Sequence, residues 1–117
     1  MSVTPSQFHL ISKLMDASAI RQRVVGQNIA NVNTPGYTAR EVDFEGQLAE
    51  QLRAGSEPGD VVPQIRLSEG AAVRSDGNNV DIDHEIGQLN KNGMLYHTYV
   101  QVLTTKISQM RSAITGR

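Results

Sequence analysis

His84 and Glu85 are the residues whose types and spacing come nearest to a catalytic motif. They match the first half of the pattern H-E-x-x-H, in which two histidines one helical turn apart bind zinc and the glutamate acts as general base. The second histidine would fall at position 88, which holds Gln88. The other histidines, His9 and His97, are distant along the chain, and no glycine-rich phosphate loop or nucleophile motif accompanies them. We therefore expect no enzyme.

The run from Asp76 to Asp81, DGNNVD, contains the acids and amides of a calcium-binding loop. However, Val80 stands where a ligand is needed, and Gly87 stands where the bidentate glutamate belongs. A turn at Asp76-Gly77 and acidic residues at the start of a helix explain the run better. The chain has no cysteine, which excludes disulfides, thiolate catalysis and cysteine-bound metals. The sequence predicts no cofactor and no metal.

Three asparagines, Asn28, Asn31 and Asn33, need a different explanation. They are poor helix formers, and they stand just before Pro35-Gly36, a pair that suits the two central positions of a type II turn. In one interpretation they end a helix, with their amides bound to its last free carbonyls. In the other, the amides and the turn reach a neighbouring chain. The residues alone leave both interpretations open.

These groups must be positioned by helices, and the clearest helix is the last third of the chain. Apolar residues recur there every 3.5 residues on average, the spacing of a long helix packed lengthwise on a partner. The ten seam residues, all apolar except Gly93, are Ile82, Ile86, Leu89, Gly93, Tyr96, Val100, Leu103, Ile107, Met110 and Ile114. At 1.5 Å per residue this stretch spans about 50 Å, so the molecule should be elongated.

A second long helix is predicted over 5–32. Thr4 and Pro5 are typical of a helix start, and apolar residues such as Ile11, Leu14 and Val25 recur at helical spacing. Its heptad seam is half polar, which can set the register of a helix pair. We therefore expect it to pack antiparallel on the C-terminal helix, which should span 81–117.

The segment between the long helices, 33–80, should be mostly irregular. Asp43 can cap a short helix in which Phe44, Leu48 and Leu52 share one face. Residues 55–80 are rich in glycine and proline and predict a loop with a small hairpin. The predicted fold is mainly α: an elongated antiparallel pair of long, coiled-coil-like terminal helices with a short middle helix, as a single elongated domain over 1–117.

The composition excludes several classes of partner. The formal net charge is −1, with acidic and basic residues interleaved, so we expect no nucleic-acid binding. No apolar stretch approaches the roughly 20 residues of a membrane-spanning helix. The first twenty residues lack a basic start followed by an apolar run. Any export should therefore use a route without a cleaved signal peptide.

The run from Gly26 to Tyr37, GQNIANVNTPGY, closely resembles the N-terminal signature of bacterial flagellar rod, hook and hook-associated proteins. The REVDFE run at 40–45, the DGNNVDID run at 76–83 and the region from Asn92 to Tyr96 resemble a proximal rod protein of that family in particular. The similarity covers nearly the whole chain and is least distinctive over 55–75.

This resemblance implies a structural subunit of the flagellar basal-body rod, located in the periplasm and exported by the flagellar type III apparatus without signal cleavage. It implies that the terminal helices form the axial coiled-coil layer of a tubular drive shaft for motility. The implied partners are copies of the chain, other rod proteins and the base of the rod at the MS ring. Two alternatives remain: a related, longer rod protein with the same signature, and a soluble helical-hairpin adaptor or secreted effector.

On this interpretation, one set of residues should contact neighbouring subunits through the helix seams, the asparagines and the turn. The predicted interface residues are Ile11, Leu14, Val25, Asn28, Asn31, Asn33, Pro35, Gly36, Tyr37, Ile86, Leu89, Tyr96, Val100, Leu103, Ile107, Met110 and Ile114.

Overall fold

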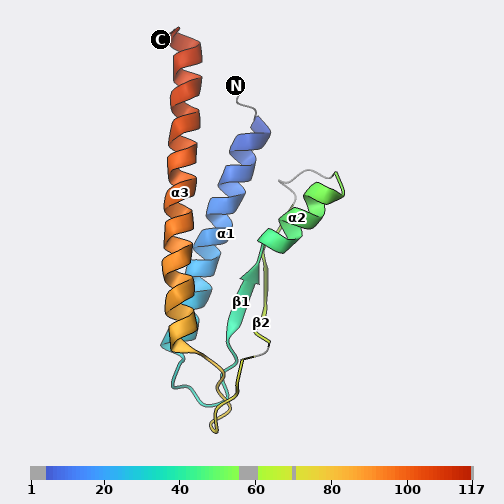
Figure 1. Cartoon of the computed structure of the whole chain (residues 1–117), viewed down its shortest axis with the longest axis vertical. Coiled ribbons are helices and arrows are strands. Elements are labelled where there is room, and N and C mark those ends of the chain that lie inside the picture. Colours follow the sequence, from blue (N-terminus) through green and yellow to red (C-terminus); the bar gives the residue numbers. More distant parts are fainter. Residues whose placement is uncertain (1–4, 56–60, 70, 117) are drawn as a thin grey trace.

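The structure, a computed structural model, describes residues 5–55, 61–69 and 71–116. Five elements follow one another: α1 (Pro5–Ala30), β1 (Arg40–Asp43), α2 (Glu45–Arg53), β2 (Gln64–Leu67) and α3 (Ile82–Thr115) (Figure 1). The two predicted long helices are confirmed, with α1 ending at Ala30 and α3 at Thr115. The expected cap Thr4 and the part of the predicted loop at 56–60 and 70 lie outside the described residues.

The two long helices lie side by side and antiparallel, with α1 in the middle of the molecule (Figure 1). On one side α1 packs against α3, and on the other it packs against β1. The principal extents are 64 × 30 × 14 Å, which confirms the expected elongated shape. The shortest extent, 14 Å, is less than half of the next one, so the molecule is a flat plate.

Both ends of α3 are capped. The side chain of Asp81 accepts hydrogen bonds from the backbone N–H groups of Asp83 and His84, at 3.1 and 3.3 Å. Gly116 ends the helix in the left-handed conformation, with φ of 72°, and its N–H donates to the carbonyl of Ser112. These caps bind backbone groups that a helix end leaves without intrahelical partners.

The seam predicted on α3 differs from the surface that α3 presents to α1. Glu85 and Asn92 are the buried residues of α3 among those described, and both are polar. By contrast, Ile86, Tyr96 and Ile107 are exposed. Leu89, Val100 and Leu103 of the predicted seam are half-buried, so the seam lies partly at the α1–α3 contact and partly along its flank, and it does not form the centre of that contact.

Polar groups on α1 explain why α3 turns Glu85 and Asn92 toward α1. The Asn92 amide donates to the carbonyl oxygen of Ser18 at 2.8 Å, and the Glu85 carboxylate accepts from Asn28 at 3.0 Å. These contacts pair the Asn92 amide nitrogen and the Glu85 carboxylate and so fix which side of α3 faces α1, while Asn92 Oδ1 is buried without a hydrogen-bond partner among the described residues. The apolar flank is left to other neighbours.

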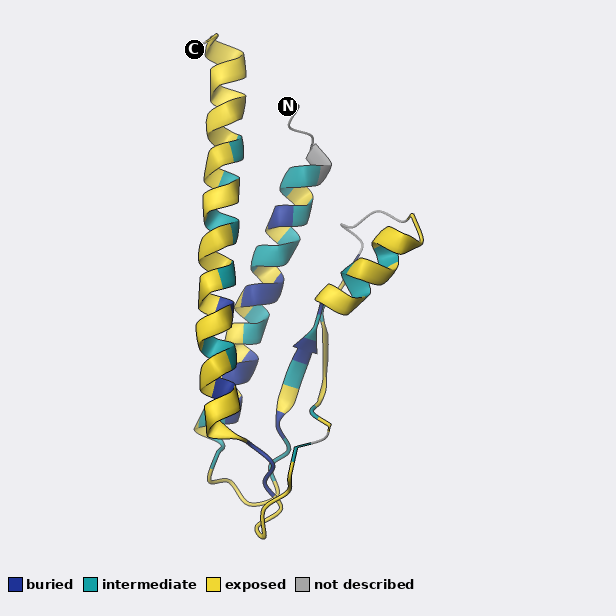
Figure 2. Ribbon diagram, in the orientation of Figure 1, coloured by how far each residue is buried: buried dark blue, intermediate teal, exposed yellow. Residues whose placement is uncertain are grey.

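The C-terminal end of α3 continues past the described part of α1. Near the start of the described part of α1, Lys106 Nζ donates to Gln7 Oε1 at 3.1 Å. All residues from 107 to 116 are exposed (Figure 2). We call residues 107–116 the α3 tip.

A small apolar core lies on the opposite side of α1. Phe44 and Val61 are fully buried there against Ala17, and Leu14 and Leu48 pack against them. The short helix predicted after Asp43 is confirmed as α2, and the carboxylate of Asp43 accepts from the N–H of Gly46 at 3.3 Å. Leu52, predicted on the same face as Phe44 and Leu48, is 54% exposed, because this small core does not extend to the last turn of α2.

The predicted strand pair is present, but its connection differs from the expected one. Strand β1 pairs antiparallel with β2, with Val42 opposite Ile65. The two strands are joined through α2 and the segment after it. The Asp76-Gly77 turn exists, because the Gly77 N–H donates to the carbonyl of Arg74 at 2.9 Å with φ of 85° at Gly77. No described strands flank that turn.

Candidate functional site

The side chain of Asn28 holds four segments of the chain together. Its Nδ2 donates to the Arg40 carbonyl at 2.8 Å and to Glu85 Oε2 at 3.0 Å. Its Oδ1 accepts from the Tyr37 hydroxyl at 2.9 Å and from the Arg40 N–H at 3.0 Å. An amide has two N–H donors and an oxygen with two lone pairs, so its hydrogen-bonding capacity is filled. Asn28 therefore joins α1 to β1, to α3 and to the turn of residues 34–37, which we call the signature turn.

Two further asparagines, Asn78 and Asn79, bind the same region from the loop before α3. Asn78 Nδ2 donates to the carbonyls of Asn31 and Thr34, each at 2.8 Å, and its Oδ1 accepts from the Val80 N–H. Asn79 Oδ1 accepts from the backbone N–H just before β1, at 2.6 Å. Both side chains are buried. The carbonyl groups at the end of α1 are thus bound partly by amides from a distant part of the sequence.

The signature turn has the geometry that its residues predict. The Tyr37 N–H donates to the Thr34 carbonyl at 3.2 Å across Pro35-Gly36, and Gly36 has φ of 76°, as the third position of a type II turn requires. The Gly36 N–H donates to the Asp76 carbonyl at 2.8 Å. A Cβ atom on Gly77 would lie only 3.2 Å from the Cα of Gly36, so these two turns touch through glycines.

Arg74 completes this contact by donating to the carbonyls of Val32 and Val80. The signature turn and the DGNNVD run therefore form one unit at the end of the molecule where α1 stops and α3 begins (Figure 1). We call it the asparagine cluster, and its members are Asn28, Asn31, Thr34, Tyr37, Arg74, Asn78, Asn79 and Glu85.

The predicted interface residues divide into three groups by exposure. Ile11, Val25 and Asn28 are buried; Leu14, Asn31, Tyr37, Leu89, Val100 and Leu103 are half-buried; Asn33, Pro35, Gly36, Ile86, Tyr96, Ile107, Met110 and Ile114 are exposed. Asn28 makes its contacts within this chain, and Asn31 bonds its own helix and turn. The exposed group is the one with surface free to meet a neighbouring subunit.

Sequence reasoning did not assign Asn78, Asn79, Glu85 and Asn92 to buried positions. The DGNNVD run indicates a turn, and Glu85 is expected only as a helix-start acid. One signal was available: a two-residue turn needs one Asp-Gly or Asn-Gly pair, whereas this run adds two asparagines after it. Of these additional amides, Asn78 binds the turn that follows α1, and Asn79 binds the backbone just before β1.

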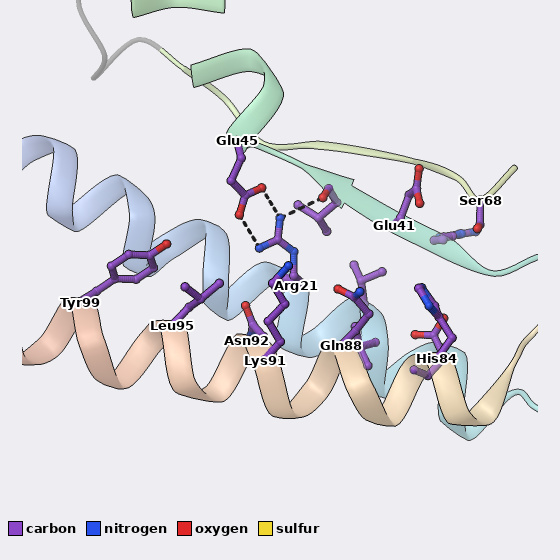
Figure 3. Close-up of a pocket in the computed structure, with 15 residues that line it drawn as sticks. Arg21, Glu41, Glu45, Ser68, His84, Gln88, Lys91, Asn92, Leu95 and Tyr99 are labelled. Atoms are coloured by element: carbon purple, nitrogen blue, oxygen red, sulfur yellow. Dashed lines mark hydrogen bonds and ion pairs between the residues drawn. The ribbon is translucent and has the colours of Figure 1, made fainter. Parts of the chain in front are cut away.

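A groove runs along α1 between α3 and β1, with a cavity volume of about 470 Å³. Figure 3 shows Leu95 and Tyr99 on its α3 wall, while Arg21 extends from α1 toward Glu45. Its lining is Arg21, Val24, Val25, Arg40, Glu41, Val42, Glu45, Ser68, His84, Glu85, Gln88, Lys91, Asn92, Leu95 and Tyr99. The formal charges of its Arg, Lys and Glu residues balance, so the groove favours a nearly neutral occupant. We call it the central groove.

One ion pair organises a wall of the central groove. Arg21 donates to both carboxylate oxygens of Glu45, at 2.8 and 2.6 Å, and to the Val42 carbonyl at 3.1 Å. The hydrogen bond from Arg21 lowers the pKa of Glu45, and the same bond raises the pKa of Arg21. Burial raises the pKa of Tyr99. This pair ties α1 to the start of α2.

The ion pair predicts a pH dependence of stability. Because the pKa of Glu45 is lowered on folding, the pair stabilises the fold above the ordinary glutamate pKa of about 4.3, and this contribution is lost as pH falls through the lowered value. Glu45 is half-exposed, so we expect a contribution below about 1 kcal/mol. The unfolding free energy of Glu45→Gln should therefore fall less than that of the wild type on acidification. Glu50→Gln on the exposed side of α2 is the control, and an equal pH slope for wild type and Glu45→Gln would contradict the prediction.

The described residues hold no group of three histidine, cysteine or acidic side chains that could bind a metal ion. Among the same residues, no helix combines the length and apolar character that crossing a membrane requires.

Comparison with known proteins places this architecture among flagellar rod proteins. Residues 15–38, which include most of α1 and the signature turn, match the family model for the flagella basal body rod protein. The chain is similar to the flagellar basal body rod protein FlgB of Salmonella typhimurium, with 31% identity over 87% of this chain and 88% of that protein. It is similar to FlgB of Borrelia hermsii, at 30% identity over 87% and 90%, and of Bacillus subtilis, at 26% over 99% and 98%.

The chain therefore belongs to the FlgB family, and it is a structural subunit of the flagellar basal body rod. This confirms the resemblance found in the signature run. The longer related rod protein, FlgC, is not favoured.

Proposed function

We propose that the chain builds the rod wall through the outward side of α3 and the exposed signature turn. The observation that carries this proposal is the exposure of apolar residues on a helix whose predicted seam α1 does not cover. The exposed side consists of Ile82, Ile86, Tyr96, Ile107, Met110 and Ile114, which we call the outer apolar face. Apolar residues that follow one side of a helix and lack a partner are typical of an interface.

The shape of the chain favours assembly with other copies over a free monomer. Among the described residues, the buried apolar cluster consists of Ala17, Phe44 and Val61, and the shortest extent of the plate is 14 Å. A layer this thin exposes both broad faces, so much of its apolar surface is covered only when copies pack together. We infer that the role is structural and involves no catalysis.

The same proposal extends to partners and location. We propose that neighbouring copies, other rod proteins and the base of the rod at the MS ring are the contacts of the outer apolar face and the turn. We further propose a periplasmic position in the rod, reached through the flagellar type III export apparatus without cleavage of a signal peptide. Family membership supports these points.

Basal bodies isolated from motile cells test the proposal. The chain should be present with its first residues intact by mass spectrometry, and microscopy should place α3 against neighbouring subunits. Absence of the chain from basal bodies, or α3 facing solvent along its outer apolar face, would contradict it.

Gly93 gives a separate test of close packing on α3. A glycine inside a helix costs about 1 kcal/mol relative to alanine, and a Cβ at Gly93 meets nothing within 4 Å in this chain. Gly93→Ala should therefore stabilise the monomer helix, measured by circular dichroism and thermal unfolding. If the rod brings another backbone close to this position, the same change should weaken assembly.

Gly87→Ala is the matched control, because Gly87 also has open space around it and lies on a different side of α3. It should raise helicity without weakening assembly. Equal assembly of both variants with the wild type would show that Gly93 is not a close-packing position.

A further inference from the structure

Helix α3 contains the pair Asn92-Gly93, the one place in the sequence where a glycine directly follows an asparagine. Such a pair is chemically labile in a flexible chain. The backbone nitrogen of Gly93 attacks the side-chain carbonyl carbon of Asn92, the side-chain nitrogen leaves as ammonia, and a cyclic imide forms. Glycine favours this attack because it has no Cβ to hinder the approach and its backbone rotates freely.

Water then opens the imide at one of its two carbonyl groups. Opening at the former side-chain carbonyl leaves aspartate. Opening at the backbone carbonyl of residue 92 leaves isoaspartate, in which the main chain runs through the side-chain carbons. The overall reaction consumes a water molecule and releases ammonia, so it needs no other reactant.

The folded chain opposes this reaction in two ways. Asn92 is only 2% exposed, and its Nδ2 donates to the Ser18 carbonyl at 2.8 Å and to Gln22 Oε1 at 3.2 Å, which holds the side chain against α1. Gly93 lies inside α3, where each backbone N–H points along the helix toward the carbonyl four residues earlier. The attacking nitrogen must turn toward the Asn92 side chain, so the helix must first unwind at this point.

The products of the reaction do not fit the folded position. A carboxylate only accepts hydrogen bonds, and the Ser18 carbonyl beside Asn92 Nδ2 also only accepts. Among the groups that Asn92 contacts, the Gln22 amide alone can turn round to donate to a buried carboxylate. Isoaspartate adds a carbon to the main chain and interrupts the regular hydrogen bonding of α3.

We propose that Asn92-Gly93 is a deamidation site that reacts in the unfolded chain and is protected when α3 pairs with α1. Asn90 provides a comparison within the same helix, because it is exposed but is followed by Lys91. A chain that stays unfolded therefore loses, with time, the contact that fixes α3 on α1. A chain that folds promptly keeps it.

Incubation of the purified full-length chain in native buffer and in guanidinium chloride, at the same pH and temperature, tests the proposal. Cleavage after Glu85 releases residues 86–117, a peptide with Asn90 and Asn92 and no further glutamate. Mass spectrometry and an isoaspartate-specific methyltransferase then measure conversion at each asparagine. We expect conversion at Asn92 in denaturant, none at Asn90, and none at either residue in native buffer. Gly93→Ala should abolish the conversion in denaturant.

Asn92→Asp measures what the modification does to folding, and Asn90→Asp is its matched control. Asn92→Asp should lower the equilibrium constant for folding by about 100-fold or more, because it buries an unpaired charge. Asn90→Asp should change that constant less than about three-fold. No conversion at Asn92 in denaturant, equal conversion at Asn90, or equally fast conversion in native buffer overturns the protected site. Equal stability of the two aspartate variants overturns the cost assigned to the modification.

Discussion

Ile107→Asp should stop rod assembly while the monomer keeps its fold. Ile107 lies at the start of the α3 tip and is exposed, so an aspartate there is solvated in the free chain. In the assembled rod we propose that this position is covered by apolar groups. An unpaired carboxylate in such a place costs several kcal/mol, and the cost recurs at every subunit. Cells carrying this change should therefore be non-motile and lack completed basal bodies.

Two measurements separate this outcome from simple misfolding. Circular dichroism and thermal unfolding of the purified chain should be nearly the same for Ile107→Asp and wild type. Gln109→Asp, an exposed change of similar size nearly opposite on the helix, should leave motility close to normal. Normal basal bodies in the Ile107→Asp strain would exclude this part of α3 from the interface.

Asn28→Ala should produce the largest loss of monomer stability among the changes considered. The substitution removes four hydrogen bonds at a fully buried position, and it leaves the Tyr37 hydroxyl, the backbone of Arg40 and the Glu85 carboxylate without this partner. Each buried polar group left unpaired costs about 1–3 kcal/mol. We expect a loss of about 3 kcal/mol or more in the unfolding free energy, measured by denaturant titration.

Asn33→Ala is the matched control, because Asn33 belongs to the same signature but is exposed. Its effect on stability should stay within about 0.5 kcal/mol. The comparison also separates the two interpretations of the asparagines. If Asn28→Ala left the unfolding free energy unchanged and affected only assembly, Asn28 would act between subunits, and the asparagine cluster would not be a stabilising unit of the chain.

The elements of this fold could be predicted because their signals are local. The 3.5-residue spacing of apolar residues indicates α3, Asp81 and Gly116 cap its ends, and Pro35-Gly36 forms the expected type II turn. The partner of each element depends on residues far apart in sequence. Periodicity alone does not show that Asn78 binds the end of α1, or that β2 pairs with β1 across α2.

The candidate interface was predicted less completely for a related reason. An apolar stripe indicates that a helix packs against something, but it does not say whether the partner lies in the same chain. Here Asn92 and Glu85 turn a polar side of α3 toward α1, and part of the stripe remains outside. The sequence marked Asn28 as an amide that either ends a helix or reaches a neighbouring chain, and its contacts within the chain became visible only with Arg40 and Glu85 beside it.

The polar contacts between α1 and α3 have a mechanical consequence for a rotating shaft. They join Glu85 to Asn28, Asn92 to Ser18, and Lys106 to Gln7, so they are distributed along most of the shared length of the helices. Torque loads a subunit in shear, which tends to slide one helix along the other. A slip of one turn, about 5.4 Å, would break these contacts together, whereas purely apolar surfaces could exchange neighbours at little cost. The helix pair should therefore deform elastically up to a threshold load, and below that load α1 should not slide gradually along α3.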